Sequence, residues 1–256
     1  MFVVETKEEL WMPFAIDECL LKKSVSQPIL HFWQTPDCVI LGMTDTKLPY
    51  LDKAIECIRR RQHEVVLRSA GGLAVVSDDG VLNVSLIFTK EELSIKEAYQ
   101  QMMDLVAKAF PEKMIEAYEV SDSYCPGEYD LSIDGKKFAG LAQRRFKDTI
   151  IVAMYLSVNG LQQERGKLVR DMYTKGLKQE KTKWHFPVVN PDSMANLSEL
   201  LHQELTVEDV KERLLQVLLN AECTLVDCIV EEEFEQEYEQ AYQAILHRQK
   251  RLSKKG

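Results

Sequence analysis

The sequence predicts a mixed α/β fold that ends in a helical C-terminal part. Short β-branched segments bounded by Pro, Gly or Asp alternate with segments of helical spacing over residues 13–109. The dipeptide Asp134-Gly135 separates two strand-like runs, which is a strong hairpin signal. Beyond Leu197 the apolar residues recur at helical spacing. Helices and strands are therefore interspersed over most of the chain.

The N-terminal half alternates between predicted helices and predicted strands. Helices are expected over Pro13 to Lys22, Leu51 to Gln62 and Ser94 to Ala109. The third of these begins with Ser94 as N-cap and has Glu97 three residues later, which is a capping box. The predicted strands are Ile29 to Trp33, Cys38 to Met43, Glu64 to Leu67, Leu73 to Ser77 and Leu82 to Ile87.

An antiparallel meander is predicted over Tyr129 to Val158. A two-residue loop at Asp134-Gly135 would pair Ile133 with Lys136 and Ser132 with Lys137. This register puts Lys137 on the same face as Asp130. A third strand, Thr149 to Val158, returns after a turn at Lys147-Asp148.

The C-terminal quarter is predicted to be helical. Helical spacing runs over Leu197 to Leu205, Val207 to Asn220 and Glu231 to Leu252, and Thr206 is placed to cap the second of these helices. We expect a catalytic domain over residues 1–200 and a helical extension over residues 201–256 that packs on it.

Composition narrows the class of protein. Hydrophobic residues make up 45% and charged residues 29% of the 256, which is typical of a chain that folds around its own core. The net charge of −9 argues against a general nucleic-acid surface. No apolar run is long enough to span a membrane, and the N-terminus lacks a signal-peptide pattern. We expect a cytoplasmic, monomeric protein that binds neither nucleic acid nor membrane.

The six cysteines point to one candidate nucleophile. They show no C-x-x-C pair and no nearby histidine at zinc-ligand spacing, so neither a disulfide framework nor a structural metal is expected. Cys125 stands in Ser123-Tyr124-Cys125-Pro126-Gly127, a turn-forming setting that exposes a thiol at a loop tip. The other five lie in helical or strand-like apolar patterns, where cysteine acts as a small hydrophobic residue.

Lys137 is the nearest candidate for activating that thiol. A lysine ammonium close to a thiol stabilises the thiolate, which is the reactive form. The alternative is a cross-strand ion pair between Lys137 and Asp130, which the predicted register permits. The residues alone leave both interpretations open.

A second candidate segment is Arg68 to Val75, which contains Gly71 and Gly72. Paired glycines between two strands allow the backbone to approach a ligand closely. Without further evidence, such a pair is more often part of a tight turn or a β-bulge. The segment matches neither phosphate-binding loop pattern, G-x-x-x-x-G-K-[ST] or G-x-G-x-x-G.

These motifs together resemble those of the biotin/lipoate protein ligase and octanoyltransferase superfamily. The resemblance is carried by RSAGGLAVVSDDGVLNVSLIF (68–88) and SYCPGEYDLSIDGKKFAG (123–140), with PFAIDECLL (13–21), VILGMTDTKLPYL (39–51) and NLSELL (196–201) in support. Within the superfamily, the chain is most similar to the octanoyl-[GcvH]:protein N-octanoyltransferase family. The likeness covers most of the chain and implies a central mixed, largely antiparallel sheet flanked by helices.

The resemblance also assigns roles to particular residues. Cys125 matches the cysteine that forms an acyl-thioester. Lys137 matches the superfamily lysine, which would lower the pKa of the cysteine and contact the acyl carbonyl. The residues that match the segment lining the acyl pocket are Arg68, Gly71, Gly72 and Leu73. Gly140, which ends the matching Lys-Phe-Ala-Gly stretch, is expected to bind the substrate as well.

The implied reaction moves an octanoyl group without any cofactor. Its donor would be the octanoylated H protein of the glycine cleavage system (GcvH), and its acceptor the lipoyl domains of 2-oxoacid dehydrogenase acyltransferase subunits. The ligases carry three glycines and an aromatic-His pair where this chain has Leu73 and Val76-Ser77, which disfavours an ATP-dependent lipoate-protein ligase. A transferase using octanoyl-acyl carrier protein as donor and GcvH as acceptor, and a fold that only binds lipoyl proteins, remain as alternatives.

Overall fold

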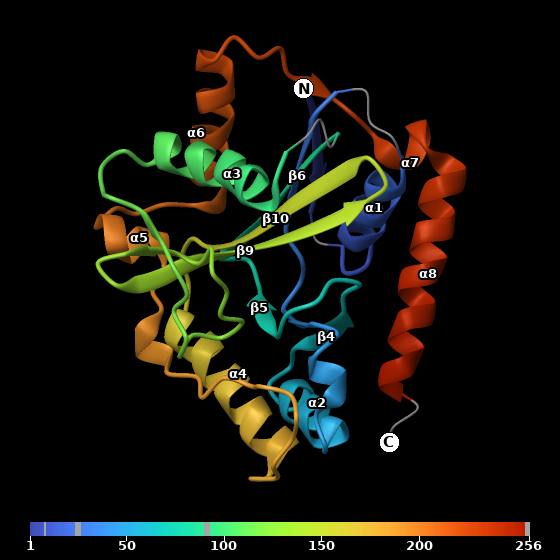
Figure 1. The fold of residues 1–256 in the computed structure, drawn as a ribbon, viewed down its shortest axis with the longest axis vertical. Helices are drawn as coiled ribbons and strands as arrows, with labels where there is room; N and C mark the ends of the chain where they lie inside the picture. Colours follow the sequence, from blue (N-terminus) through green and yellow to red (C-terminus); the bar gives the residue numbers. More distant parts are fainter. Residues whose placement is uncertain (8, 24–26, 90–92, 254–256) are drawn as a thin grey trace.

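The computed structural model describes residues 1–7, 9–23, 27–89 and 93–253 (Figure 1). Two sheets organise this part of the chain. The larger, eight-stranded sheet has the order β11-β1-β2-β6-β10-β9-β8-β7, and the smaller has the order β4-β3-β5. The strands are β1 (Phe2–Thr6), β2 (Ile29–Trp33), β3 (Cys38–Leu41), β4 (Glu64–Leu67), β5 (Val75–Ser77), β6 (Val81–Thr89), β7 (Glu116–Ala117), β8 (Leu131–Ile133), β9 (Lys136–Phe146), β10 (Thr149–Ser157) and β11 (Val226–Asp227).

Helices lie on both sides of the large sheet (Figure 1). They are α1 (Met12–Lys22), α2 (Leu51–Arg59), α3 (Ile95–Ala109), α4 (Gln162–Leu177), α5 (Leu197–Leu201), α6 (Val207–Asn220), α7 (Val230–Glu233) and α8 (Glu235–Ser253), with short 3₁₀ turns η1 (Asp45–Lys47) and η2 (Pro191–Ser193). In the order across the large sheet, every pairing from β2 through β6, β10, β9 and β8 to β7 is antiparallel. At the other edge, β1 pairs in parallel with β2 and β11. The predicted fold class is confirmed.

Most predicted elements in the N-terminal half are confirmed. β2 and β4 have the predicted bounds, and α3 begins with the capping box of Ser94 and Glu97. Two predicted strands are shorter in the structure, because β3 ends at Leu41 and β5 begins only at Val75. The residues between them belong to loops that approach each other closely, as described below.

The predicted hairpin has the predicted register. Ile133 pairs with Lys136 and Ser132 with Lys137 around the turn at Asp134-Gly135. That turn has φ of 51° at Asp134 and 79° at Gly135, the left-handed conformation that a two-residue hairpin loop needs. β10 then returns antiparallel to β9, as the meander requires.

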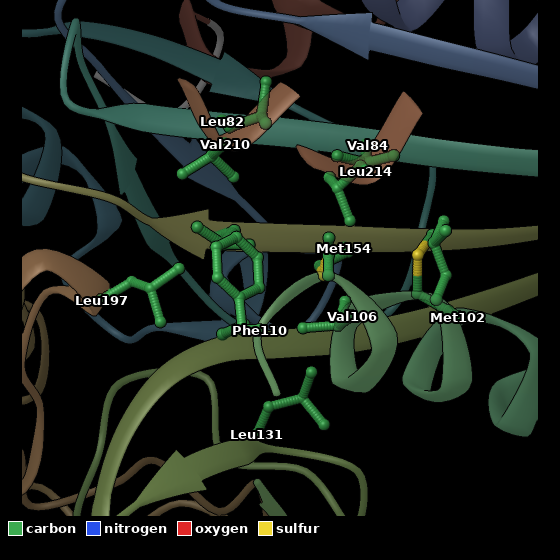
Figure 2. Packing of buried hydrophobic residues seen from close by; sticks show 14 of the residues in the cluster. Leu82, Val84, Met102, Val106, Phe110, Leu131, Met154, Leu197, Val210 and Leu214 are labelled. Carbon is green, nitrogen blue, oxygen red and sulfur yellow. The ribbon is translucent and has the colours of Figure 1, made fainter. Parts of the chain in front are cut away.

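The main hydrophobic core lies between the large sheet and helices α3 and α6 (Figure 2). Alternate residues of β6, Leu82 and Val84, face this core because successive side chains of a strand point to opposite faces. Val106 of α3 and Leu214 of α6 are both fully buried against them. Helix α6, in the predicted C-terminal extension, thus shares a core with the central sheet. The proposed boundary at residue 200 stays a prediction.

Two further clusters complete the packing of the described residues. One surrounds the small sheet, where α2 packs against α4. The other lies between α1, α8 and the opposite face of the large sheet, and Figure 1 shows α8 running alongside the N-terminal part of the chain. No helix in the described ranges is long and apolar enough to cross a membrane.

The sequence interpretation missed α4 for a physical reason. Its inward face contains Gly166 and Gly176, and an added Cβ there would lie 2.9 Å from Pro191 and 3.0 Å from Leu48. These glycines and the buried polar residues Gln162 and Arg165 shorten the apolar stripe to Leu168–Tyr173, which makes the helix harder to detect from the sequence. The predicted helix from Glu231 to Leu252 is divided at Phe234 into α7 and α8.

The prediction for two cysteines was wrong. Cys223 lies in the turn after α6, and Cys228 lies between β11 and α7, where its thiol donates to Glu233. Both are half-buried in loops rather than inside apolar elements. Cys19, Cys38 and Cys57 do lie in α1, β3 and α2.

Leu214→Ala tests whether α6 contributes to the common core. Deleting this fully buried side chain should lower the free energy of unfolding by about 2–5 kcal/mol, because a cavity is left in the packed core. Leu219→Ala, on the same helix at 49% exposure, is the matched control and should change it by less than about 0.5 kcal/mol. Chemical denaturation measures both, and equal effects would contradict the packing described.

Candidate active site

Cys125 lies in the loop that connects β7 to β8. It is half-buried and has φ of 47°, a left-handed conformation that residues other than Gly rarely adopt. Its Sγ accepts hydrogen bonds from the backbone N–H of Leu73 at 3.4 Å and from an Nη of Arg68 at 3.7 Å. The thiol therefore faces the second candidate segment of the sequence.

The Cys125 loop is closed by a buried ion pair between Lys137 and Asp130. Lys137 Nζ lies 2.9 Å from Asp130 Oδ1, and the two side chains are 4% and 1% exposed. Asp130 Oδ2 also accepts hydrogen bonds from the backbone N–H groups of Val120 and Gly127. Burial raises the pKa of Asp130, and the Lys137 ammonium opposes that shift. The predicted ion pair is confirmed.

The same ammonium group holds the tip of the loop. Lys137 Nζ donates to Ser123 Oγ at 3.2 Å and to the backbone oxygens of Tyr124 at 3.0 Å and Cys125 at 2.9 Å. Together with Asp130 these are four acceptors around one ammonium. Lys137 thus positions the cysteine through its backbone, and its role in lowering the pKa of the thiol stays a prediction.

The glycine-containing segment packs against the thiol. Gly72 has φ of 82°, and a Cβ there would lie 2.8 Å from Arg68 and 3.4 Å from Cys125 Sγ. Gly42, at the end of β3, meets the same loop, and its added Cβ would lie only 2.1 Å from the Gly72 oxygen. Gly71 faces open space, and its carbonyl accepts a hydrogen bond from Arg68. Gly72 and Gly42 thus permit the close approach that stops β3 early.

Both ends of this segment are fixed by side chains from distant helices. The Gln249 amide of α8 donates to the Leu67 oxygen at 3.0 Å and accepts from the Leu67 N–H at 2.7 Å. At the other end, Tyr173 of α4 accepts a hydrogen bond from the Ala74 N–H and donates to Asp45. Burial raises the pKa of Asp45 to about 7, against the opposing hydrogen bond from Tyr173.

A cavity of about 120 Å³ opens beside Cys125 and Lys137. Its lining is drawn from α1, strands β3 and β5 of the small sheet, the segment after β4, the Cys125 loop and the large sheet. Most of the lining residues are apolar, and they include Phe14, Trp33, Ile40, Val75, Ala142, Ile151 and Ala153. Such a cavity suits an apolar chain attached to a group that reacts at the thiol.

Small side chains form the middle of the cavity floor. Gly140 of β9 pairs with Tyr155 of β10, and the next inward-facing pair is Ala142 with Ala153. A Cβ on Gly140 would lie 3.3 Å from Lys137 Cε, so glycine leaves this end of the floor open beside the lysine. Of the predicted site residues, Cys125, Lys137, Arg68 and Gly140 line this cavity. Gly72 and Leu73 lie beside the thiol without lining the cavity, and Gly71 faces open space.

Arg144, which lines the cavity, and Glu18, which does not line it but binds Arg144, were not predicted from the sequence. Glu18 of α1 accepts hydrogen bonds from Arg144 of β9 and from Ser69, both at 3.0 Å, and pairs with Lys22 at 3.1 Å. Burial would raise the pKa of Glu18, but Arg144 and the hydrogen bonds outweigh it and lower this pKa to about 2. The signal for Arg144 was its alternation with Gly140 and Ala142 along β9, which sets one face of the strand.

A polar network lies along the same cavity. Asp17 of α1 lines the cavity and contacts His31 Nδ1 at 2.8 Å and Ser85 Oγ at 2.6 Å. His31 is fully buried and also contacts Thr6. Within the described ranges, no group of three or more His, Cys, Asp or Glu side chains is arranged to hold a metal ion.

Residues 9–219 match the model of the family described as "Lipoyl protein ligase A/B catalytic domain". The chain belongs to this family. Among its curated relatives is an octanoyl-[GcvH]:protein N-octanoyltransferase of Lysinibacillus sphaericus, 44% identical over 80% of this chain and 76% of the relative. A lipoyl-[GcvH]:protein N-lipoyltransferase of Listeria monocytogenes is 38% identical over 92% of this chain and 87% of the relative.

The solved structures agree on the fold of this lipoyl protein ligase A/B family member. A bipartite lipoate protein ligase from Thermoplasma acidophilum, solved in a study of that ligase and its E2 lipoyl domain, superposes with a TM-score of 0.69. The match covers 94% of this chain and 91% of the other at 17% identity, which is evidence for the fold alone. The family model and the curated relatives confirm the resemblance of the sequence motifs to the ligase and octanoyltransferase superfamily.

Substituting each cation near Cys125 should show which one stabilises the thiolate. Arg68→Met should slow alkylation of Cys125 by iodoacetamide at neutral pH by roughly tenfold, because the guanidinium contacts Sγ. Lys137→Met should have a smaller effect, since its ammonium contacts Asp130 and backbone oxygens. Alkylation rates over a range of pH, followed by peptide mass analysis, measure both. A larger effect at Lys137 would contradict this order and favour the role that the resemblance implies.

Glu18→Gln should reduce stability in a pH-dependent manner. Because the pKa of Glu18 is lowered to about 2 in the folded state, its stabilising effect is complete above about pH 4.5 and disappears as the pH falls toward 2. The difference in free energy of unfolding between wild type and variant should shrink across this window in denaturant titrations. Glu64→Gln, which alters an exposed carboxylate, is the control. A difference that stays constant with pH would contradict the prediction.

Proposed function

We propose that this protein is an acyltransferase that moves an octanoyl group from the lysine of GcvH to the lysine of a lipoyl domain, through a thioester on Cys125. One observation carries the proposal: the Cys125 thiol lies at an apolar cavity and accepts hydrogen bonds from the Leu73 N–H and Arg68. The name of the 44%-identical relative from Lysinibacillus supports the choice of octanoyl group and donor.

In the first half of the reaction, the Cys125 thiolate attacks the carbonyl carbon of the octanoyl amide. A C–S bond forms, the C–N bond breaks, and the lysine of the donor leaves as an amine after taking up a proton. The acyl chain lies over Gly140, Ala142 and Ala153, where the floor of the cavity is formed by small residues. The arrangement holds the reacting carbonyl at the sulfur.

Arg68 and Lys137 have different positions in this step. Arg68 and the Leu73 N–H contact the sulfur and stabilise its negative charge. The Nε of Arg68 is buried and has no hydrogen-bond partner within the described ranges, so it is available to the acyl carbonyl oxygen. Lys137 holds the loop and lines the cavity beside Gly140, where its ammonium also reaches the carbonyl.

In the second half, the lysine amine of the acceptor attacks the thioester. A C–N bond forms, the C–S bond breaks, and the thiolate is regenerated as the amine loses its proton. Donor and product are both octanoyl amides of lysine, so their free energies are similar and the exchange requires no ATP and no cofactor. This proposal places the protein in the cytoplasm as a monomer.

The acceptor is proposed from the names of two similar proteins. The name of the Lysinibacillus relative includes GcvH and a protein acceptor, and the Thermoplasma structure was described together with an E2 lipoyl domain. A lipoyl domain presents one lysine to its modifying enzyme, which fits attack on a single thioester. The Listeria relative, named for lipoyl transfer, makes a lipoyl donor a second candidate for the same cavity.

Incubation with octanoylated GcvH should acylate Cys125. Intact-mass measurement is expected to reveal one octanoyl adduct that hydroxylamine removes, because a thioester is cleaved by that nucleophile. Cys125→Ser should not form the hydroxylamine-labile adduct. Cys57→Ser, which alters a half-buried thiol on α2, is the matched control and should form it as wild type does.

The donor arms of this experiment separate the alternatives. No adduct from octanoyl-GcvH would overturn the proposal. An adduct only from octanoyl-acyl carrier protein would assign the other transferase reaction, and a requirement for ATP would assign a ligase. Adding a lipoyl domain to the acylated enzyme should transfer the octanoyl group to its lysine.

A further inference from the structure

We propose that Arg144, held in place by its ion pair with Glu18, forms the end wall of the acyl cavity and sets the longest acyl chain that Cys125 accepts. The inference rests on the proposed function, because it assigns the cavity to the acyl group. It adds a specificity-determining pair that lies away from the reacting thiol. The pair joins α1 to β9 across the cavity.

The register of the sheet places Arg144 at the far end of the cavity floor. Inward-facing pairs follow one another along β9 and β10, from Gly140 with Tyr155 to Ala142 with Ala153 and then Arg144 with Ile151. Each step of two residues advances about 7 Å, so Arg144 lies about 13 Å along the strand from Gly140, which is beside Lys137. An acyl chain attached to Cys125 would cross the small residues and then meet Arg144, the longest side chain of this face.

Ion pairing fixes the Arg144 side chain in that position. Its guanidinium lies 3.0 Å from Glu18 Oε2, and Lys22 holds the other oxygen of Glu18 at 3.1 Å. The Glu18 side chain is only 8% exposed and that of Arg144 is 28% exposed. Pushing an apolar chain end between them would separate partly buried charges, which costs more than rearranging an exposed side chain. The end of the cavity is therefore resistant to longer chains.

The wall is also connected to the segment that contacts the thiol. Ser69 donates to the same Glu18 oxygen that binds Arg144, and Ser69 directly follows Arg68. A chain long enough to displace Glu18 would disturb Ser69 and, through it, the Arg68 contact with Cys125. Overlong chains are thus disfavoured both by the wall and at the reacting end.

The test uses p-nitrophenyl esters of hexanoic, octanoic, decanoic and dodecanoic acids, which acylate a thiol without a protein donor. The Cys125 thiolate attacks the ester carbonyl, the C–S bond forms, and p-nitrophenolate leaves and is measured by absorbance. In Arg144→Ala the ratio of decanoyl to octanoyl acylation rates should rise by about tenfold or more, as expected for added methylenes in an apolar pocket. Arg145→Ala is the matched control, because Arg145 bonds Gln143 and Leu93 instead of Glu18.

A second variant distinguishes the loss of the end wall from a general loss of structure. Arg144→Met retains much of the side-chain length without the charge, so it should raise the ratio less than Arg144→Ala while losing the pairing with Glu18. An unchanged ratio in Arg144→Ala, or equal changes in Arg144→Ala and Arg145→Ala, would overturn the inference. Failure of octanoyl-GcvH to acylate wild type would overturn the proposed function instead, whatever the ester ratios.

Discussion

The buried ion pair between Lys137 and Asp130 is the constraint on which the site depends. Asp130 accepts hydrogen bonds from the backbone of Val120 and Gly127, which lie on either side of Cys125, and Lys137 donates to the carbonyls at the tip of the loop. Removing either partner would leave an uncompensated buried charge, at a cost of about 3–5 kcal/mol. The loop therefore keeps its shape only while β9 retains its register with β8. The turn at Asp134-Gly135 thus controls the position of a thiol nine residues earlier in the chain.

The strands of the large sheet pack against the core with one face and line the cavity with the other. On β6, Leu82 and Val84 enter the core under α3 and α6, whereas Asn83 and Ser85 alternate with them. Asn83 lines the cavity, and Ser85 is bonded to the cavity residue Asp17. The period of two along each strand lets one face be packed tightly while the other retains small and polar residues. A packed core below the floor keeps that floor rigid enough to position an acyl chain.

The sequence predicted those structural features that depend on residues close to one another in the chain. The hairpin register, the capping box at Ser94 and the ion pair of Lys137 with Asp130 each follow from residues a few positions apart, and each is confirmed. The Arg68 contact with Cys125 joins residues separated by 57 positions, and no local pattern indicates it. Glu18 and Arg144 meet across 126 positions for the same reason. Motif resemblance placed Arg68 and Cys125 in one pocket without revealing that they touch.

Lys137 and Arg68 have different roles because their hydrogen-bond donors are satisfied to different extents. Lys137 has four acceptors around its ammonium, and through them it holds the loop in place. Arg68 bonds two carbonyls and the sulfur, yet its buried Nε has no partner within the described ranges. An unsatisfied buried donor costs about 1–3 kcal/mol, so a bound oxygen at this position would recover stabilisation that the free protein lacks. In the proposed reaction, an acyl carbonyl that becomes negatively charged during attack would gain most from that donor, so its interaction with Arg68 would strengthen as the reaction proceeds.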